Sequence, residues 1–158
     1  MAEQDIALMA HLLRRAGFGA SRDEIEAKAD QGYDSVVQEL LNPETQEAVA
    51  EDLLVRYNPS YYEAAAIENN VQQWVWRMIN SPRQLQEKVA LFWHMIFCAG
   101  HSKIDSGQEM GLMVDIFRQQ GMGKFDELLL GLSTNPGMMY YLDNTESHKA
   151  NLNENYGR

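Results

Sequence analysis

The sequence contains a single cysteine, Cys98, so no disulfide can form within the chain. No paired Cys or Cys/His spacing of the kind that holds structural zinc is present either. Cys98 lies in an apolar run, which predicts a buried and unreactive thiol. Only four prolines interrupt the 158 residues, and 45% of the residues are hydrophobic. This composition is typical of a globular protein, and the length suffices for one domain with a sizeable core.

Basic residues are also scarce. The chain has 13 Lys and Arg against 23 Asp and Glu, which gives a formal net charge of −10. Because no basic stripe is available to neutralise phosphates, the sequence disfavours nucleic-acid binding. The acidity is concentrated in residues 20–70, where twelve acidic side chains stand against three basic ones. This region is interpreted either as a solvated helical surface or as an acidic docking face for a basic partner protein.

No apolar run is long enough to cross a bilayer. The longest, residues 89–99, contains His94 and falls short of the roughly 20 residues that a transmembrane helix needs. The first five residues are acidic where a signal peptide would be basic, and no apolar leader segment follows them. The sequence therefore predicts a soluble protein without a membrane span, cytoplasmic by default.

Strand-like alternation is missing, and apolar residues recur instead at spacings of three and four. Two capping-box patterns mark helix starts, one at Ser21 with Glu24 and one at Ser60 with Glu63. The second half of the segment 82–99 is apolar on all sides, which predicts a central, buried helix. We therefore expect an all-α fold: an irregular unit of seven to nine helices packed around the buried helix 82–99.

His94 lies inside that expected buried helix. A charged imidazole in apolar surroundings is costly, so His94 must be hydrogen-bonded or shifted toward its neutral form. It is interpreted either as a structural histidine or as a ligand or acid–base residue. His101 is seven residues on, but Gly100 is expected to end the helix before it. No His-Glu-x-x-His pattern is present, so a metal site would need ligands from elsewhere, and the sequence specifies no cofactor.

The last residues, 151–158, carry the pattern of a helix N-terminus. We therefore expect residues 1–158 to be the N-terminal part of a single larger helical domain, truncated at its C-terminal end. Amides and carboxylates are dense in this segment and in the turn before it. Together with His94 they form the predicted catalytic set, in which Glu154 is the best candidate for a metal ligand or general base: His94, Asn144, Asn153, Glu154 and Arg158. An ordinary surface salt bridge between Glu154 and Arg158 is the alternative.

A second predicted site binds a ligand near the N-terminus. His11 lies at a helical spacing from Arg14 and Arg15, and the three could bind a carboxylate or a phosphate beside the turn at residues 17–19. That turn matches neither the Walker pattern nor the dinucleotide-binding glycine pattern. In the alternative interpretation, the arginines extend across a neighbouring helix and pair with acidic residues.

Four blocks of sequence, in this order, resemble the large bacterial family catalogued as domain of unknown function 1800. They are residues 11–19 (HLLRRAGFG), 87–94 (EKVALFWH), 141–144 (YLDN) and 153–158 (NENYGR). The resemblance spans nearly the whole chain and implies the first third or so of a typical member. It also implies a helical fold, with export signals in some members, and it assigns no reaction.

Two functions follow from these observations. The first is an enzyme domain, hydrolytic or metal-assisted, whose polar pocket gathers His94 with the residues of the chain end. The second is a helical scaffold or binding module that docks a partner protein through the acidic region 20–70.

Overall fold

The computed structural model describes residues 3–57 and 66–158, and over these residues the chain forms ten α-helices and no β-strand. The all-α fold class is thereby confirmed. The helices are α1 (Glu3–Ala16), α2 (Arg22–Gln31), α3 (Tyr33–Leu41), α4 (Glu51–Tyr57), α5 (Ile67–Asn80), α6 (Gln84–Ile96), α7 (His101–Ile104), α8 (Gly107–Gln120), α9 (Phe125–Ser133) and α10 (Pro136–Tyr141). Two short 3₁₀ helices, η1 (Pro43–Thr45) and η2 (Asn144–Glu146), complete the set. Among these described elements, no helix is both long and apolar enough to span a membrane.

Local sequence signals place several of these helix ends. At the start of α2, the Ser21 side chain accepts a hydrogen bond from the Glu24 backbone N–H, and the Glu24 carboxylate accepts one from the Ser21 N–H at 2.7 Å. The predicted capping box is therefore present. Gly32 separates α2 from α3 with φ of 94°, a left-handed conformation that glycine adopts without strain. The second predicted box, at Ser60 and Glu63, lies outside the described residues.

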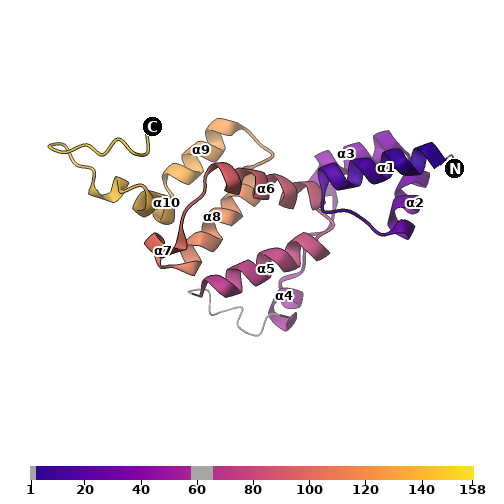
Figure 1. The fold of residues 1–158 in the computed structure, drawn as a ribbon, viewed down its shortest axis with the longest axis horizontal. Coiled ribbons are helices and arrows are strands. Elements are labelled where there is room, and N and C mark those ends of the chain that lie inside the picture. The colour runs from indigo at the N-terminus through magenta and orange to yellow at the C-terminus, as the bar shows by residue number, and fades with distance from the viewer. Residues whose placement is uncertain (1–2, 58–65) are drawn as a thin grey trace.

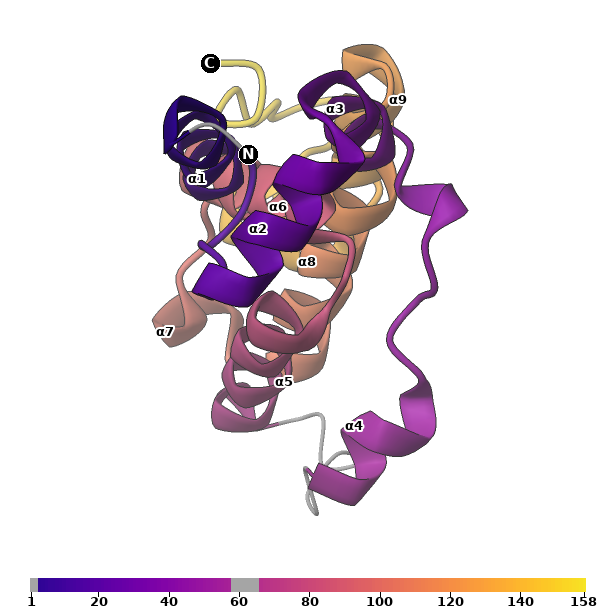
Figure 2. The same ribbon diagram turned by 90° about the vertical axis from the view of Figure 1, so that its right-hand side faces the viewer.

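The helices form an elongated body. Figure 1 shows α1, α2 and α3 at one end and α7 and α10 at the other, with α6 and α8 running between them. Helix α4 stands at the side of the body (Figure 2), and the ring of Tyr57 at its end stacks on Trp76 of α5 at a centroid distance of 6.2 Å. The molecule is therefore organised by its two central helices.

Two separate clusters of buried side chains form the core. The larger cluster lies around α8 and comprises Ala90, Met113, Phe117, Leu128, Leu132 and Met138. The smaller cluster joins α1 to α3 and comprises Met9, Ala16, Val36 and Leu40. Helix α6 connects them, because its Ala90 belongs to the larger cluster while its Leu85 packs against the smaller one.

The prediction of a helix at 82–99 that is buried on all sides is not confirmed. Helix α6 ends at Ile96 and buries only Glu87 and Ala90, whereas Met95 is 67% exposed. The central position belongs to α8, which packs against α5, α6, α7, α9 and α10. Cys98 follows the end of α6 and is exposed, so the prediction of a buried thiol is wrong.

A buried carboxylate ties three helices together. Glu87 of α6 is 1% exposed, and its two oxygens accept hydrogen bonds from Arg118 Nε of α8 at 2.7 Å and from Trp74 Nε1 of α5 at 3.1 Å. Arg118 also pairs with Asp115 on its own helix. A buried charge is tolerated only when it is paired and hydrogen-bonded, so this network fixes how α5, α6 and α8 meet.

We predict that Arg118→Met lowers the free energy of unfolding by about 3–5 kcal/mol, because it leaves the Glu87 carboxylate buried without its cation. Arg22→Met is the matched control, since the Arg22–Glu26 pair has side chains that are 68% and 41% exposed. The control should change stability by less than about 1 kcal/mol. Urea denaturation of both variants measures the difference. Equal losses of stability in the two variants would show that the Glu87 network stabilises the fold no more than the exposed Arg22–Glu26 pair does.

Candidate functional site

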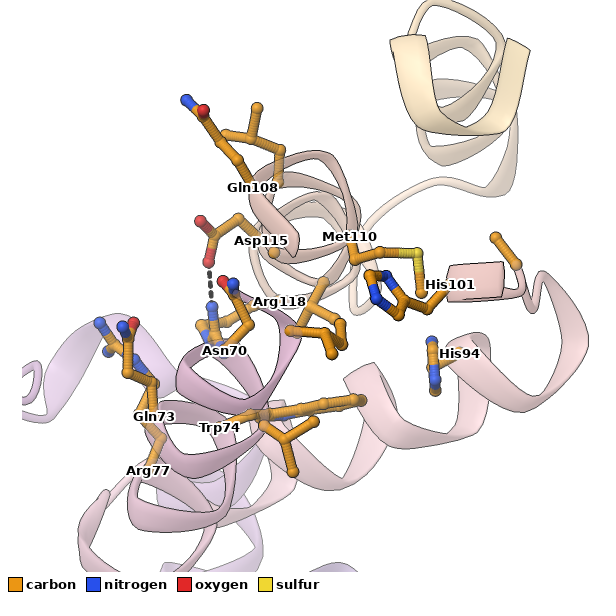
Figure 3. A pocket seen from close by; sticks show the side chains of 16 residues that line it. Asn70, Gln73, Trp74, Arg77, His94, His101, Gln108, Met110, Asp115 and Arg118 are labelled. Atoms are coloured by element: carbon orange, nitrogen blue, oxygen red, sulfur yellow. Dashed lines mark hydrogen bonds and ion pairs between the residues drawn. The ribbon is translucent and has the colours of Figure 1, made fainter. Parts of the chain in front are cut away.

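A cavity of about 580 Å³ lies between α5, α6, α7 and α8. Apolar side chains such as Trp74 and Leu112 form part of its wall, and polar side chains from all four helices complete it (Figure 3). The polar ones are Asn70, Gln73, Arg77, His94, His101, Gln108, Asp115 and Arg118. Its volume lies within the range typical of small-molecule sites, roughly 300–1,000 Å³.

His94 faces this cavity from the last turn of α6. Its Nδ1 atom is buried and has no hydrogen-bond partner in the described part of the chain. The ring meets Trp74 edge-on at a centroid distance of 5.2 Å and Phe117 at 6.2 Å. Burial among these rings lowers the pKa of His94 below the ordinary 6.5, since a charged imidazole loses its hydration there. His94 is therefore neutral at pH 7, and a neutral imidazole has one nitrogen lone pair to donate.

His101 lines the same cavity from the first position of α7, and its Nδ1 atom is also buried without a partner among the described residues. The two histidines do not share a helix, because α6 ends at Ile96 and α7 begins after Gly100. The chain turns between them and presents both rings to one space, as Figure 3 shows. Gly100 lies close to the Tyr141 ring, which a Cβ at this position would meet at 3.4 Å.

Helix α7 is held in place by the turn that follows α10. Lys103 Nζ donates to the Tyr141 carbonyl at 2.7 Å and pairs with the Asp143 carboxylate at 2.6 Å. Asp143 itself has a left-handed backbone with φ of 57°. The turn that contains the predicted residue Asn144 is thus connected to the helix that carries His101.

Asn153 lies beside the same turn. Its Nδ2 atom donates to the Asp143 carbonyl at 3.2 Å, and its backbone N–H donates to Ser147 Oγ at 3.2 Å. Farther on, the Tyr156 hydroxyl contacts Ser133 Oγ at the end of α9. The C-terminal segment therefore packs against the helical body.

Glu154 and Arg158 form an exposed ion pair at 2.9 Å, with side chains 72% and 74% exposed. Neither they nor Asn144 and Asn153 are among the residues that line the cavity. The structure thus brings His94 together with His101, but not with the other four members of the predicted catalytic set. The catalytic roles of those four stay a prediction.

The second predicted site lies on the surface of α1. His11, Arg14 and Arg15 are exposed. The turn at residues 17–19 lines a second cavity of about 730 Å³, between α1–α3 and the facing ends of α5 and α6, but the three predicted residues are not part of its lining. Ligand binding by these residues stays a prediction.

Several residues of the cavity escape sequence reasoning. Trp74 reads as one member of an apolar stripe, and Arg118 as an ordinary polar residue of its helix. Glu87 does not line the cavity but pairs with Arg118, and its only sequence signal is its place at the start of the block EKVALFWH. Across the described ranges, no group of three or more His, Cys, Asp or Glu side chains is arranged to hold a metal ion.

A family model described as "Protein of unknown function (DUF1800)" matches residues 11–158. The chain belongs to this family. No curated protein and no solved structure matches it significantly. The matched region of this DUF1800 member includes all four helices that enclose the cavity.

We predict that the His94 pKa makes stability depend on pH. Because burial lowers this pKa below 6.5, the unfolded chain takes up the proton first as the pH falls. The free energy of unfolding should therefore decrease as the pH falls through 6.5. Between about pH 8 and pH 5, wild type should lose stability relative to His94→Gln. Urea denaturation measures this loss, and an NMR titration midpoint for His94 at or above 6.5 would contradict it.

Proposed function

We propose that the cavity between α5, α6, α7 and α8 is a metal-assisted active site in which His94 and His101 donate nitrogen ligands. One observation carries the proposal: two buried imidazole nitrogens, on two different helices, reach one cavity without hydrogen-bond partners among the described residues. Buried polar atoms are nearly always satisfied, so two such atoms in one place point to a bound group that satisfies both.

The second histidine supports a metal-bound role for His94. Two imidazole nitrogens that reach one cavity suit ligation of one ion, whereas a general base acts as a single histidine oriented by a carboxylate. The two carboxylates of the nearby network, Glu87 and Asp115, are paired with Arg118 and not with His94. A neutral imidazole keeps the free lone pair that ligation requires.

Two protein nitrogens leave coordination positions for a reactant. Catalytic metal sites keep such an open position, and the volume of this cavity accommodates a small molecule beside the ion. Trp74 gives the cavity a flat apolar wall, while the amides of Gln73 and Gln108 supply polar contacts. These features support binding of a small organic reactant that combines an apolar body with polar groups.

The polar residues near the chain end belong to the proposal as neighbours of α7. Lys103, which follows His101 by two residues in α7, forms an ion pair with Asp143 in the turn after α10. Asn153 holds this turn through its hydrogen bond to the Asp143 carbonyl, and the catalytic roles of Asn144 and Asn153 stay predictions. Glu154 and Arg158 remain the predicted ligand or base and its partner.

The alternative function, docking of a basic partner on the acidic region 20–70, has less support. Several acidic side chains in this region already have cationic partners within the chain. Glu26 pairs with Arg22, and Glu39 accepts from Lys28 Nζ at 2.6 Å. These pairs leave the net charge of the region at −9, but its described residues, unlike the cavity, include no buried polar side-chain atom without a partner that would point to a bound group.

We predict that the purified, metal-stripped protein binds one equivalent of a transition-metal ion in a manner that depends on His94 and His101. A panel of Zn²⁺, Co²⁺, Ni²⁺, Fe²⁺ and Cu⁺, followed by elemental analysis and thermal unfolding, tests this. His94→Gln and His101→Gln should each weaken binding by at least about tenfold, since even loss of an outer-shell partner costs 10–100-fold.

His148→Gln is the matched control, because His148 is exposed and does not line the cavity. It should bind as wild type does. Equal metal content and affinity in all three histidine variants would overturn the proposed function.

A further inference from the structure

We propose further that the metal ion is Cu(I), held by His94, His101 and the thioether sulfur of Met110. This inference rests on the proposed metal-binding role of the cavity and specifies which ion the cavity selects. Met110 is 8% exposed, lies in the first turns of α8 and lines the cavity. Figure 3 shows the Met110 side chain pointing toward His101, and Met110, His94 and His101 all line the cavity.

The set of available donors favours a soft ion. Structural Zn²⁺ takes four Cys or His ligands, and catalytic Zn²⁺ takes three protein ligands drawn from His, Cys and carboxylates. No group of three such side chains exists in residues 3–57 and 66–158. Thioether and imidazole ligands suit Cu(I), which is also stable with only two or three ligands. Two imidazoles and one thioether therefore match Cu(I) better than any harder ion.

The charges around the cavity favour a monovalent ion over a divalent one. Arg77 and Arg118 both line the cavity. Arg118 is paired with two carboxylates, Glu87 and Asp115, so its charge is already compensated within the chain. Two guanidinium groups and two carboxylates together leave no excess negative charge to stabilise an ion, and removing an ion from water costs more for a divalent than for a monovalent one. Neutral His and Met ligands add no negative charge that would offset this cost.

The surface thiol has to be removed before the inference is tested. Cys98 is exposed and is not among the residues that line the cavity. Thiolates bind Cu(I) strongly, so Cys98 would contribute a second, unrelated site. All variants are therefore made in a Cys98→Ser background.

The decisive comparison is between two methionines of the same helix. Met110 lines the cavity, whereas Met113 is fully buried in the larger core cluster and does not. Each is replaced by Leu, which preserves volume and removes the sulfur. Cu(I) affinity is measured anaerobically by competition with a chromophoric Cu(I) chelator, and Ag(I) serves as a redox-inert probe.

We expect one equivalent of Cu(I) or Ag(I) in the parent protein and at least about a tenfold loss of affinity in Met110→Leu. Met113→Leu should bind as the parent does, and His94→Gln should bind more weakly. Equal affinities of the parent and Met110→Leu would overturn the assignment of the sulfur ligand. Equal losses in both Leu variants would also overturn it, because they would indicate general repacking.

The outcomes separate this inference from the proposed function. If Zn²⁺ or Ni²⁺ binds in a His94-dependent manner while Cu(I) and Ag(I) do not, the Cu(I) inference fails and the metal-assisted site stands. If no ion of the panel depends on His94, both fail.

Discussion

The burial of one carboxylate charge determines how the centre of this protein is arranged. Glu87 needs both Arg118 and Trp74 as partners, and these three residues lie on the three helices α6, α8 and α5. The same three helices enclose most of the cavity. Arg118 and Trp74 each contact Glu87 and also line the cavity, so the network that satisfies the buried charge sets the shape of the site. Trp74 then positions His94 through an edge-on ring contact. The side chains that hydrogen-bond the buried Glu87 carboxylate are therefore also side chains that shape the cavity.

Much of the secondary structure follows from local chemistry that can be read in the sequence. The capping box at Ser21 and the all-helical class both appear as predicted. Burial is harder to predict from the sequence. An apolar helix surface is buried only where a neighbouring element covers it, and the sequence does not specify that neighbour. The last turns of α6 illustrate this: Phe92 and Ile96 remain about half exposed, at 48% and 52%, since α8 rather than α6 occupies the centre.

The candidate site was predictable only in part. His94 stands out in sequence because it interrupts an apolar run, and the structure places it in the cavity. The sequence does not connect His101 with His94, because Gly100 separates the two residues, yet a turn of the chain brings both to the same space. The residues near 153–158 attracted attention through their density of polar groups. Density along a sequence does not specify which way a segment faces, and Glu154 is turned toward solvent.

Helix α7 has only four residues, which is too short for a helix to be stable on its own. Its orientation therefore depends on contacts with other elements, among them the contacts of Lys103 with Tyr141 and Asp143. In the proposed site, binding of a ligand to His101 and ordering of the turn after α10 would be linked equilibria. Each would then stabilise the other by the same free energy, so residues after α10 would modulate ligand affinity without contacting the ligand.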